Sequence, residues 1–305
     1  MVRLNFVLTH FSDLSIITAM LFFTYLFFTY LFFHFFPKTY PIWNVSLKQS
    51  PFFSIIIPSY NRAAFLNRSI HSITQQHFPN IEIIVVDDNS QDNSVFQLKS
   101  LKEKLALPYL RIIQNKENKG TLITRIIGIN SCTGEFMLNL DPDDQFSKNL
   151  FQTLFIHIQK KKSDIIHFRF YLSRNGIISE KNYIHYRYPT YSQMNHSVLL
   201  QEIMGRRIGW SLCFQCLRKS IVMMALNFIF PSIRNKSLCN GEDMVICFSC
   251  YIFCKKYSFL DFFGYIYYFD TPCVRKKCKN DFNPRAFIND LYHNVFHLKK
   301  SYLII

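Results

Sequence analysis

The stretch FMLNLDPDD, residues 136–144, determines how the rest of the chain can be organised. A short apolar run that stops at acidic residues is typical of a buried strand that ends at a functional site. In open α/β sheets, ligands bind beyond the carboxyl ends of the strands. The carboxylates of Asp141, Asp143 and Asp144 follow one another so closely that they repel unless a cation or hydrogen-bond donors hold them.

Two interpretations of this acidic strand end are open. Hard divalent cations such as Mg²⁺ or Mn²⁺ prefer oxygen ligands, and they keep waters and substrate phosphates in their coordination shell. The first interpretation is therefore a site for a metal ion and a diphosphate. The second is an acidic turn without a ligand, because Asp-Pro-Asp-Asp is also favourable turn chemistry.

Composition allows a large core and favours an anionic partner. The 305 residues suffice for one large α/β domain or two modest ones, and 49% of them are hydrophobic. The net charge of +15 suits nucleic acid, anionic lipid or a phosphorylated substrate. The sequence has neither an RNP-like aromatic strand nor zinc-finger spacing, so we do not expect nucleic acid as a partner.

Strand and helix patterns alternate up to residue 150. Apolar runs predict strands at residues 52–58, 81–86, 109–113 and 136–140, and helical spacing predicts helices at 63–77, 92–106 and 121–132. This alternation predicts a parallel sheet with helices on its faces. The second half is less regular, with predicted helices at 150–162, 239–256 and 284–300, strands at 164–171 and 257–269, a strand and loop at 210–220, and a hairpin turn at Asn175-Gly176.

The N-terminal region contains a long apolar segment. Residues 14–36 carry no formal charge at neutral pH when His34 is taken as neutral, and a helix of this length would span about 35 Å. We predict an uncleaved transmembrane anchor here, with a cleaved signal peptide as the alternative. Residues 1–13 would be a short tail and residues 37–50 a stem. The flanking charges do not settle which way the anchor is oriented.

The nine cysteines also allow two interpretations. Cys213-x-x-Cys216 and Cys247-x-x-Cys250 resemble halves of a zinc site. However, Cys247, Cys250 and Cys254 have helical spacing among apolar residues, which is typical of a buried helix face with small side chains.

Four stretches, in this order, resemble the family 2 glycosyltransferases, which have the GT-A type of nucleotide-sugar-binding fold. They are SIIIPSYNR at 54–62, IVVDDNS at 84–90, NKG at 118–120 followed by Arg125 and TGEF at 133–136, and LDPDD at 140–144. A fifth stretch, GED at 241–243, opens a predicted helix and is similar to the motif that carries the family's catalytic base. The resemblance is strong over residues 52–150 and patchy over 200–275.

The resemblance implies a role for each site residue. Sugar transfer from a nucleotide diphosphate needs a nucleotide pocket, a cation that offsets charge on the leaving group, and a base for the attacking hydroxyl. By resemblance, the nucleotide sugar is bound by Pro58, Tyr60, Asn61, Asp88, Arg125 and Asp141. Asp88 would contact the base or ribose, Arg125 the base, and Asp141 the ribose or the metal.

The remaining roles concern the metal and the chemical step. Asp143 would be the direct ligand of a Mn²⁺ or Mg²⁺ ion, and Asp144 would support it or cap a helix. Asp243 would be the catalytic base in a direct displacement that inverts the anomeric carbon. The chain departs from the family's usual pattern at Pro142, where a small residue is usual, and around Arg125, where Ala-Arg-Asn is usual.

Each role has a structural alternative. Asp88 could cap a turn, and Arg125 could be a solvated charge on a helix surface. Asp243 could do no more than place a favourable negative charge at the N-terminus of a helix. Trp210 could stack on an acceptor sugar or be a core residue. The basic residues Arg275, Lys276, Lys277 and Lys279 could clamp the diphosphate or form a solvated basic run near a membrane.

The sequence therefore predicts a membrane-anchored, metal-dependent glycosyltransferase. The fold class is α/β, a GT-A-type mixed, mostly parallel sheet flanked by helices, behind an N-terminal transmembrane helix. Residues 51–150 would bind the nucleotide sugar, residues 151–283 the acceptor, and residues 284–305 would form a C-terminal helix. The expected partners are a nucleotide sugar, the membrane, and a carbohydrate, protein-glycan or lipid acceptor.

The sequence also bears on where the protein is located and on two other function classes. Sequons at Asn44, Asn67, Asn195 and Asn235 permit a lumenal domain, so a single-pass Golgi or ER protein is expected with its orientation open. The alternative function is a scaffold that kept the fold and lost turnover. A nucleotidyltransferase shares strand-end carboxylates, but it usually has a Gly-rich basic first loop that residues 58–61 lack.

Overall fold

The structure, a computed structural model, describes residues 51–180, 187–189, 192–205, 208–233, 241–271 and 283–302. The chain divides into two units, Met1–Gln49 and Ser50–Ile305, and only the second is described here. The predicted anchor at 14–36, the stem at 37–50 and the basic residues 275–279 lie outside the described residues. Within the described ranges, no helix is both long enough and apolar enough to cross a membrane.

One mixed sheet forms the centre of this unit, with strand order β3-β2-β1-β4-β9-β6-β10-β5. Its parallel ladders join β1 (Phe53–Ser59), β2 (Ile81–Asp87), β3 (Leu110–Gln114) and β4 (Phe136–Asn139), and also β6 (Ile165–Arg174) with β10 (Tyr257–Tyr268). The antiparallel pairs are short and involve β5 (Gln145–Phe146), β7 (Ile177–Ser179), β8 (Gln193–Met194) and β9 (Gln215–Arg218). The predicted mixed sheet and the hairpin at Asn175-Gly176 are confirmed.

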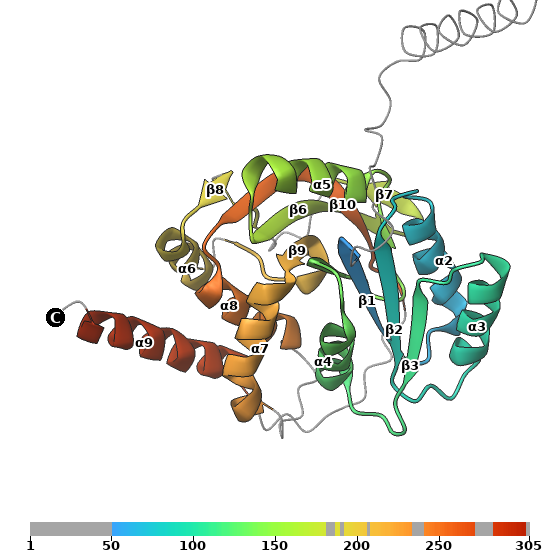
Figure 1. Cartoon of the computed structure of the whole chain (residues 1–305), viewed down its shortest axis with the longest axis horizontal. Helices are drawn as coiled ribbons and strands as arrows, with labels where there is room; N and C mark the ends of the chain where they lie inside the picture. The colour runs from blue at the N-terminus through green and yellow to red at the C-terminus, as the bar shows by residue number, and fades with distance from the viewer. Residues whose placement is uncertain are drawn as a thin grey trace, which may run out of the picture. The chain divides into compact units, whose positions relative to one another are not determined.

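Helices cover both faces of the sheet (Figure 1). The predicted helices are α2 (Ala63–Thr74), α3 (Ser94–Lys104), α4 (Thr121–Ser131), α5 (Leu150–Lys161), α8 (Glu242–Phe253) and α9 (Pro284–Tyr302). The sequence prediction missed α6 (His196–Met204) and α7 (Lys219–Ile233), as well as the short 3₁₀ turn η1 (Leu212–Phe214). The α7 sequence is apolar nearly all round and contains Pro231, so it lacks the one-sided period that marks an amphipathic helix.

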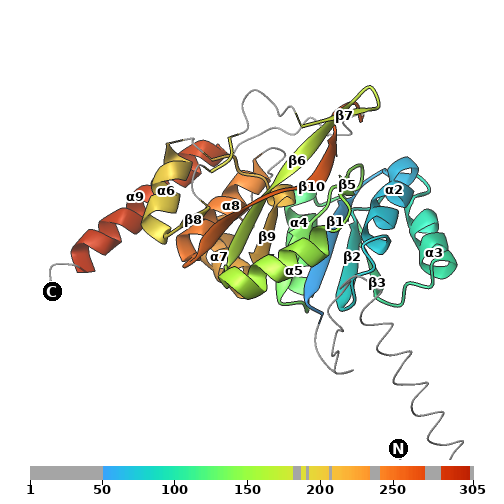
Figure 2. The ribbon, with the colours of Figure 1, turned by 90° about the horizontal axis from the view of Figure 1, so that it is seen from above.

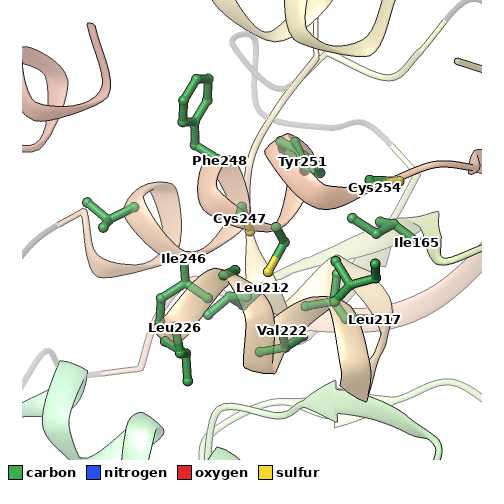
Figure 3. Packing of buried hydrophobic residues seen from close by; sticks show 14 of the residues in the cluster. Ile165, Leu212, Leu217, Val222, Leu226, Ile246, Cys247, Phe248, Tyr251 and Cys254 are labelled. Atoms are coloured by element: carbon green, nitrogen blue, oxygen red, sulfur yellow. The ribbon is translucent and has the colours of Figure 1, made fainter. Parts of the chain in front are cut away.

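The two faces of the sheet have separate packing partners. In Figures 1 and 2, α2 and α3 lie together on one side of β1–β3, and α4 lies on the other. Phenylalanines join β1 to α5 on the α2 side, where the rings of Phe53 and Phe151 lie 5.6 Å apart. On the opposite side, α4, α6, α7, α8 and α9 share one large apolar cluster, part of which Figure 3 shows.

Gly128 lets α4 lie close to the strands. A Cβ at this position would come within 2.5 Å of Ile56 Cγ2, so any larger residue would push the helix away from β1. This close packing matters for function because Arg125 projects from the same helix.

Candidate functional site

The candidate site lies where β1, β2 and β4 end and α8 begins. Leu140 N donates to Ile56 O at 2.9 Å, so pairing continues one residue past β4. The backbone N of Asp141 then donates to the hydroxyl of Tyr265 on β10 at 3.1 Å. Asp141 is thus fixed at the carboxyl end of its strand, as the sequence predicts.

Arg125 connects the end of β4 with the start of α8. Its Nη2 lies 2.8 Å from Asp141 Oδ1 and 3.6 Å from Asp243 Oδ1, and its Nη1 lies 3.4 Å from Asn139 Oδ1. Its side chain is only 3% exposed, so the solvated-charge alternative is wrong. Burial alone would lower the pKa of Arg125, but Asp243 and Asp141 raise it well above its usual value, so the guanidinium stays charged.

Asp243 is placed at the first turn of α8 by Gly241, whose φ of 87° is favourable for glycine. Its Oδ2 lies 3.4 Å from both Ser211 Oγ and Leu212 N. Its Oδ1 is enclosed and accepts no hydrogen bond from any described residue, although it faces Arg125. Asp243 thus has one carboxylate oxygen beside a buried cation, and its role as the catalytic base stays a prediction.

Burial also shifts the pKa values of the two carboxylates at the start of α8, Glu242 and Asp243. Burial raises the pKa of Asp243, while Arg125 lowers it and Asp141 raises it further. The neighbouring Glu242 has its pKa raised to about 7, first by burial and then by Asp243. A carboxylate whose pKa is raised toward neutrality is a stronger base than a solvated aspartate.

Asp143 and Asp144 have different surroundings. Asp143 Oδ2 lies 3.5 Å from Arg62 Nε, and the Asp143 carbonyl accepts from Arg68 Nη2. Asp144 is buried and accepts from Tyr265 OH and Tyr268 N, both at 2.8 Å. Asp144 therefore ties the turn after β4 to β10 and does not face an open site.

Asp141 and Asp143 offer carboxylate oxygens, the type of ligand that a divalent cation prefers. Burial raises the pKa of Asp143, and the nearby Asp141 raises it further against the opposing effect of Arg62, so the ionised carboxylate is incompletely compensated. The described part of the chain contains no group of three or more His, Cys, Asp or Glu side chains that could hold a metal by themselves. Mg²⁺-type sites commonly use one or two carboxylates and complete their shell with waters and substrate phosphates.

Asp88 holds a loop in the structure. Its Oδ1 accepts from Asn115 Nδ2 and Lys119 N, and its Oδ2 accepts from Gly120 N, all at 2.8 Å. These contacts fix the loop that leads into α4, and so they help to place Arg125. A contact of Asp88 with a nucleotide base or ribose stays a prediction.

The loop after β1 is tied to the loop after β2. Asn61 has a left-handed φ of 51°; its N donates to Ser90 Oγ at 2.9 Å, and its Oδ1 accepts from Gln91 N at 2.8 Å. Pro58 is buried in β1, and Tyr60 is partly exposed next to it. This arrangement presents residues 58–61 beside the strand ends, and their nucleotide contacts stay a prediction.

Sequence reasoning missed several residues that shape the site. Arg62, Arg68 and Ser211 contact the aspartates directly, and Tyr265 bridges Asp141 and Asp144. Arg62 is the last residue of the motif at 54–62, but no role was assigned to it, whereas Tyr265 is one tyrosine among many. Trp210, the neighbour of Ser211, is partly buried and packs against the main apolar cluster.

The zinc interpretation is not supported. The six described cysteines, Cys132, Cys213, Cys216, Cys247, Cys250 and Cys254, are free and buried. Among the described residues, no group of three or more His, Cys, Asp or Glu side chains is placed so that it could hold a metal ion. Figure 3 shows Cys247 and Cys254 among apolar side chains, which is the alternative that the helical spacing predicts.

Comparison with known proteins identifies the family. The family described as "Glycosyl transferase family 2" matches residues 54–225, more than half of the chain. The chain belongs to glycosyltransferase family 2. The match covers β1 to β4, Asp141 and Arg125, and it ends before Asp243.

The relatives and solved structures agree with this assignment. The chain is 30% identical over 166 residues to the glycosyltransferase GlyG of Streptococcus pneumoniae. The aligned residues cover 52% of this chain and 51% of GlyG. It is 24% identical over 217 residues to the poly(ribitol-phosphate) beta-N-acetylglucosaminyltransferase TarS of Staphylococcus aureus, covering 70% of this chain and 35% of TarS. The match thus spans about half the length of GlyG and less of TarS.

Crystal structures of a TarS fragment show the same fold. The complex of that fragment with UDP aligns with a TM-score of 0.56 at 21% identity, covering 71% of this chain and 60% of the fragment. The complex with UDP-GlcNAc aligns with a TM-score of 0.58 at 19% identity, covering 77% of this chain and 68% of the fragment. The predicted GT-A fold is confirmed.

Proposed function

We propose that this family 2 protein transfers a sugar from a nucleotide diphosphate to an acceptor hydroxyl, with inversion at the anomeric carbon. The observation that carries the proposal is the bridge of Arg125 between Asp141 and Asp243. Asp141 lies at the strand end where a sugar nucleotide would bind, and Asp243 is a carboxylate that would accept a proton. Both lie against the same buried guanidinium, so donor and acceptor chemistry would meet in one place.

The transfer would be a single displacement. The acceptor hydroxyl oxygen forms a bond with the anomeric carbon, and the bond from that carbon to the diphosphate oxygen breaks. The bonding electron pair leaves with the nucleoside diphosphate, and the Asp243 carboxylate takes the proton of the hydroxyl. Arg125 keeps Asp243 ionised before the step because its charge lowers the pKa that burial raises.

Asp143, with Asp141 beside it, would hold a Mn²⁺ or Mg²⁺ ion. When bound, such an ion supplies positive charge against the charge that develops on the diphosphate. Asp144, Tyr265 and Arg68 position the two aspartates through the contacts described above. The loops at 58–62 and 87–90 would grip the base and ribose.

Uridine diphosphate sugars are the first donors to test. The TarS structures contain UDP and UDP-GlcNAc, and this chain shares their fold. The acceptor would be a carbohydrate, a protein glycan or a glycolipid.

We also propose that residues 14–36 anchor the protein in a membrane, because they form an uncharged segment long enough to span one. Deleting residues 1–49 tests this idea, because residues 50–305 form a compact unit. The truncated protein should leave the membrane fraction and keep its affinity for UDP. Truncated protein that stays in the membrane fraction after a carbonate wash would refute the anchor.

In the presence of Mn²⁺, the full-length protein should hydrolyse at least one nucleotide sugar or transfer the sugar from it to an acceptor. The Asp243→Asn variant should bind the same donor without turning it over. A scaffold protein would instead show no turnover with any donor and no nucleotide binding in either form.

A further inference from the structure

Arg62 and Asp143 form an ion pair at the candidate metal ligand. Arg62 immediately precedes α2, and its Nε lies 3.5 Å from Asp143 Oδ2. The two side chains are 14% and 19% exposed, so the pair is largely shielded from water. The guanidinium also lies over the ring of Phe65, 5.9 Å from its centroid. Shielding strengthens the attraction between the two charges relative to a surface pair.

The backbone of Asp143 is held separately. Arg68 on α2 donates to the Asp143 carbonyl, and its guanidinium stacks on the ring of Tyr268, 3.6 Å from the centroid. Tyr268 N in turn donates to Asp144 Oδ1 at 2.8 Å. The Asp143 side chain can therefore change partners while its backbone stays where it is.

A cation on Asp143 would compete with Arg62. A divalent ion needs the carboxylate oxygens that face the guanidinium, and two positive groups at one carboxylate repel each other. Among the described residues, no acceptor is hydrogen-bonded to either Nη atom of Arg62. A guanidinium with free parallel donors matches two phosphate oxygens.

We propose that Arg62 exchanges partners when the donor binds. Without donor, Arg62 pairs with Asp143 and competes with a divalent cation for that carboxylate. When the nucleotide diphosphate binds, Arg62 would leave Asp143 and donate to the diphosphate, and Asp143 would then be available to hold a divalent cation. This inference rests on the proposed function and adds a diphosphate-binding residue that also makes metal and donor binding depend on each other.

The test measures binding of two probes to the full-length protein, Mn²⁺ alone and UDP with saturating Mn²⁺. Arg62→Gln should tighten Mn²⁺ binding about tenfold without nucleotide, because the ion no longer has to displace a guanidinium. The same variant should weaken UDP binding about tenfold, because a charged donor to the diphosphate is lost. Arg285→Gln removes an exposed charge on α9 and should change neither affinity.

Two further variants keep the test decisive. Arg62→Lys should fold and keep the Mn²⁺ affinity of the wild type, while losing part of the UDP affinity, because a lysine cannot form the paired contact. Asp143→Asn should weaken Mn²⁺ binding in the presence of UDP. Mn²⁺ affinity that is unchanged or weaker in folded Arg62→Gln overturns the exchange, as does unchanged UDP affinity.

The same data separate this inference from the proposed function. If Asp143→Asn weakens Mn²⁺ binding and Arg62→Gln has no effect, only the exchange fails. If Asp143→Asn leaves Mn²⁺ binding unchanged, Asp143 is not the metal ligand, and the exchange fails together with the metal assignment.

Discussion

Arg125 Nη2 on α4 lies 3.6 Å from Asp243 Oδ1 on α8; the arginine is buried, and this oxygen accepts no hydrogen bond from the part of the chain that the structure describes. Neither element is next to the other in the sequence, and the contact forms because both helices pack on the same side of the sheet. The pair places a permanent positive charge beside the carboxylate that we propose as the base. The two largest influences on the pKa of Asp243 oppose each other, because burial raises it and Arg125 lowers it.

Replacing Arg125 should move the pH dependence of turnover in a defined direction. The base must be ionised, so kcat rises with pH as Asp243 loses its proton. Arg125 lowers the pKa of Asp243, so Arg125→Gln should raise it and shift the acidic limb to higher pH. The loss of activity should be large at acidic pH and partly recovered at alkaline pH, as a kcat–pH profile measures.

A conservative variant serves as the control for this shift. Arg125→Lys keeps the positive charge, so its acidic limb should lie closer to that of the wild type, even if kcat falls because the paired geometry is lost. An acidic limb that does not move in Arg125→Gln would show that the guanidinium does not act on the base.

Glu242 provides a test of which carboxylate is the base. Its pKa of about 7 gives it suitable acidity, but its neighbour Asp243 has the contact with Arg125. Glu242→Gln should therefore keep kcat within about tenfold of the wild type and keep an acidic limb. A loss of turnover as severe as that of Asp243→Asn would transfer the role of base to Glu242.

The hydroxyl of Tyr265 should matter for both stability and activity. It donates to buried Asp144 and accepts from the backbone N of Asp141, so Tyr265→Phe removes one oxygen and leaves two buried partners. We expect a loss of about 1–3 kcal/mol in the free energy of unfolding, and a lower kcat because Asp141 is less well fixed. Chemical denaturation and steady-state kinetics measure the two effects.

The matched control is Tyr109→Phe. Tyr109 is partly buried, and among the residues that the structure describes it has no hydrogen-bond partner for its hydroxyl. The free energy of unfolding of that variant should stay within about 0.5 kcal/mol of the wild-type value. If Tyr265→Phe changes the free energy of unfolding as little as Tyr109→Phe does, the bridge between Asp141 and Asp144 does not contribute to stability.

Sequence patterns predicted the first half of the fold well because each strand there is an apolar run that ends at polar residues. β1, β2, β3 and β4 and the helices between them all lie close to their predicted ranges. α6 was missed because it is short, although its buried residues Leu199, Leu200 and Ile203 have helical spacing. α7 was missed because large apolar residues, among them Met224, Phe228 and Phe230, also occupy its exposed face and hide the one-sided period.

The site was predictable as a set of residue types but not as a set of contacts. Asp141, Asp143 and Asp243 could be named from their motifs. Arg125 could be named too, but as a contact of the nucleotide base and not as the residue between Asp141 and Asp243. Arg62 and Tyr265 could not be assigned a role, because their contacts join elements that are far apart in the sequence. Asp88 shows the reverse case, since a motif residue has its carboxylate occupied by backbone and amide donors of the loop before α4.

The most direct test of the account compares donor binding and turnover in Asp243→Asn. If Asp243 takes the proton from the acceptor hydroxyl, this variant should bind UDP with wild-type affinity and lose about 10²–10⁴-fold in kcat. A folded Asp243→Asn protein that transfers sugar at the wild-type rate would contradict the account.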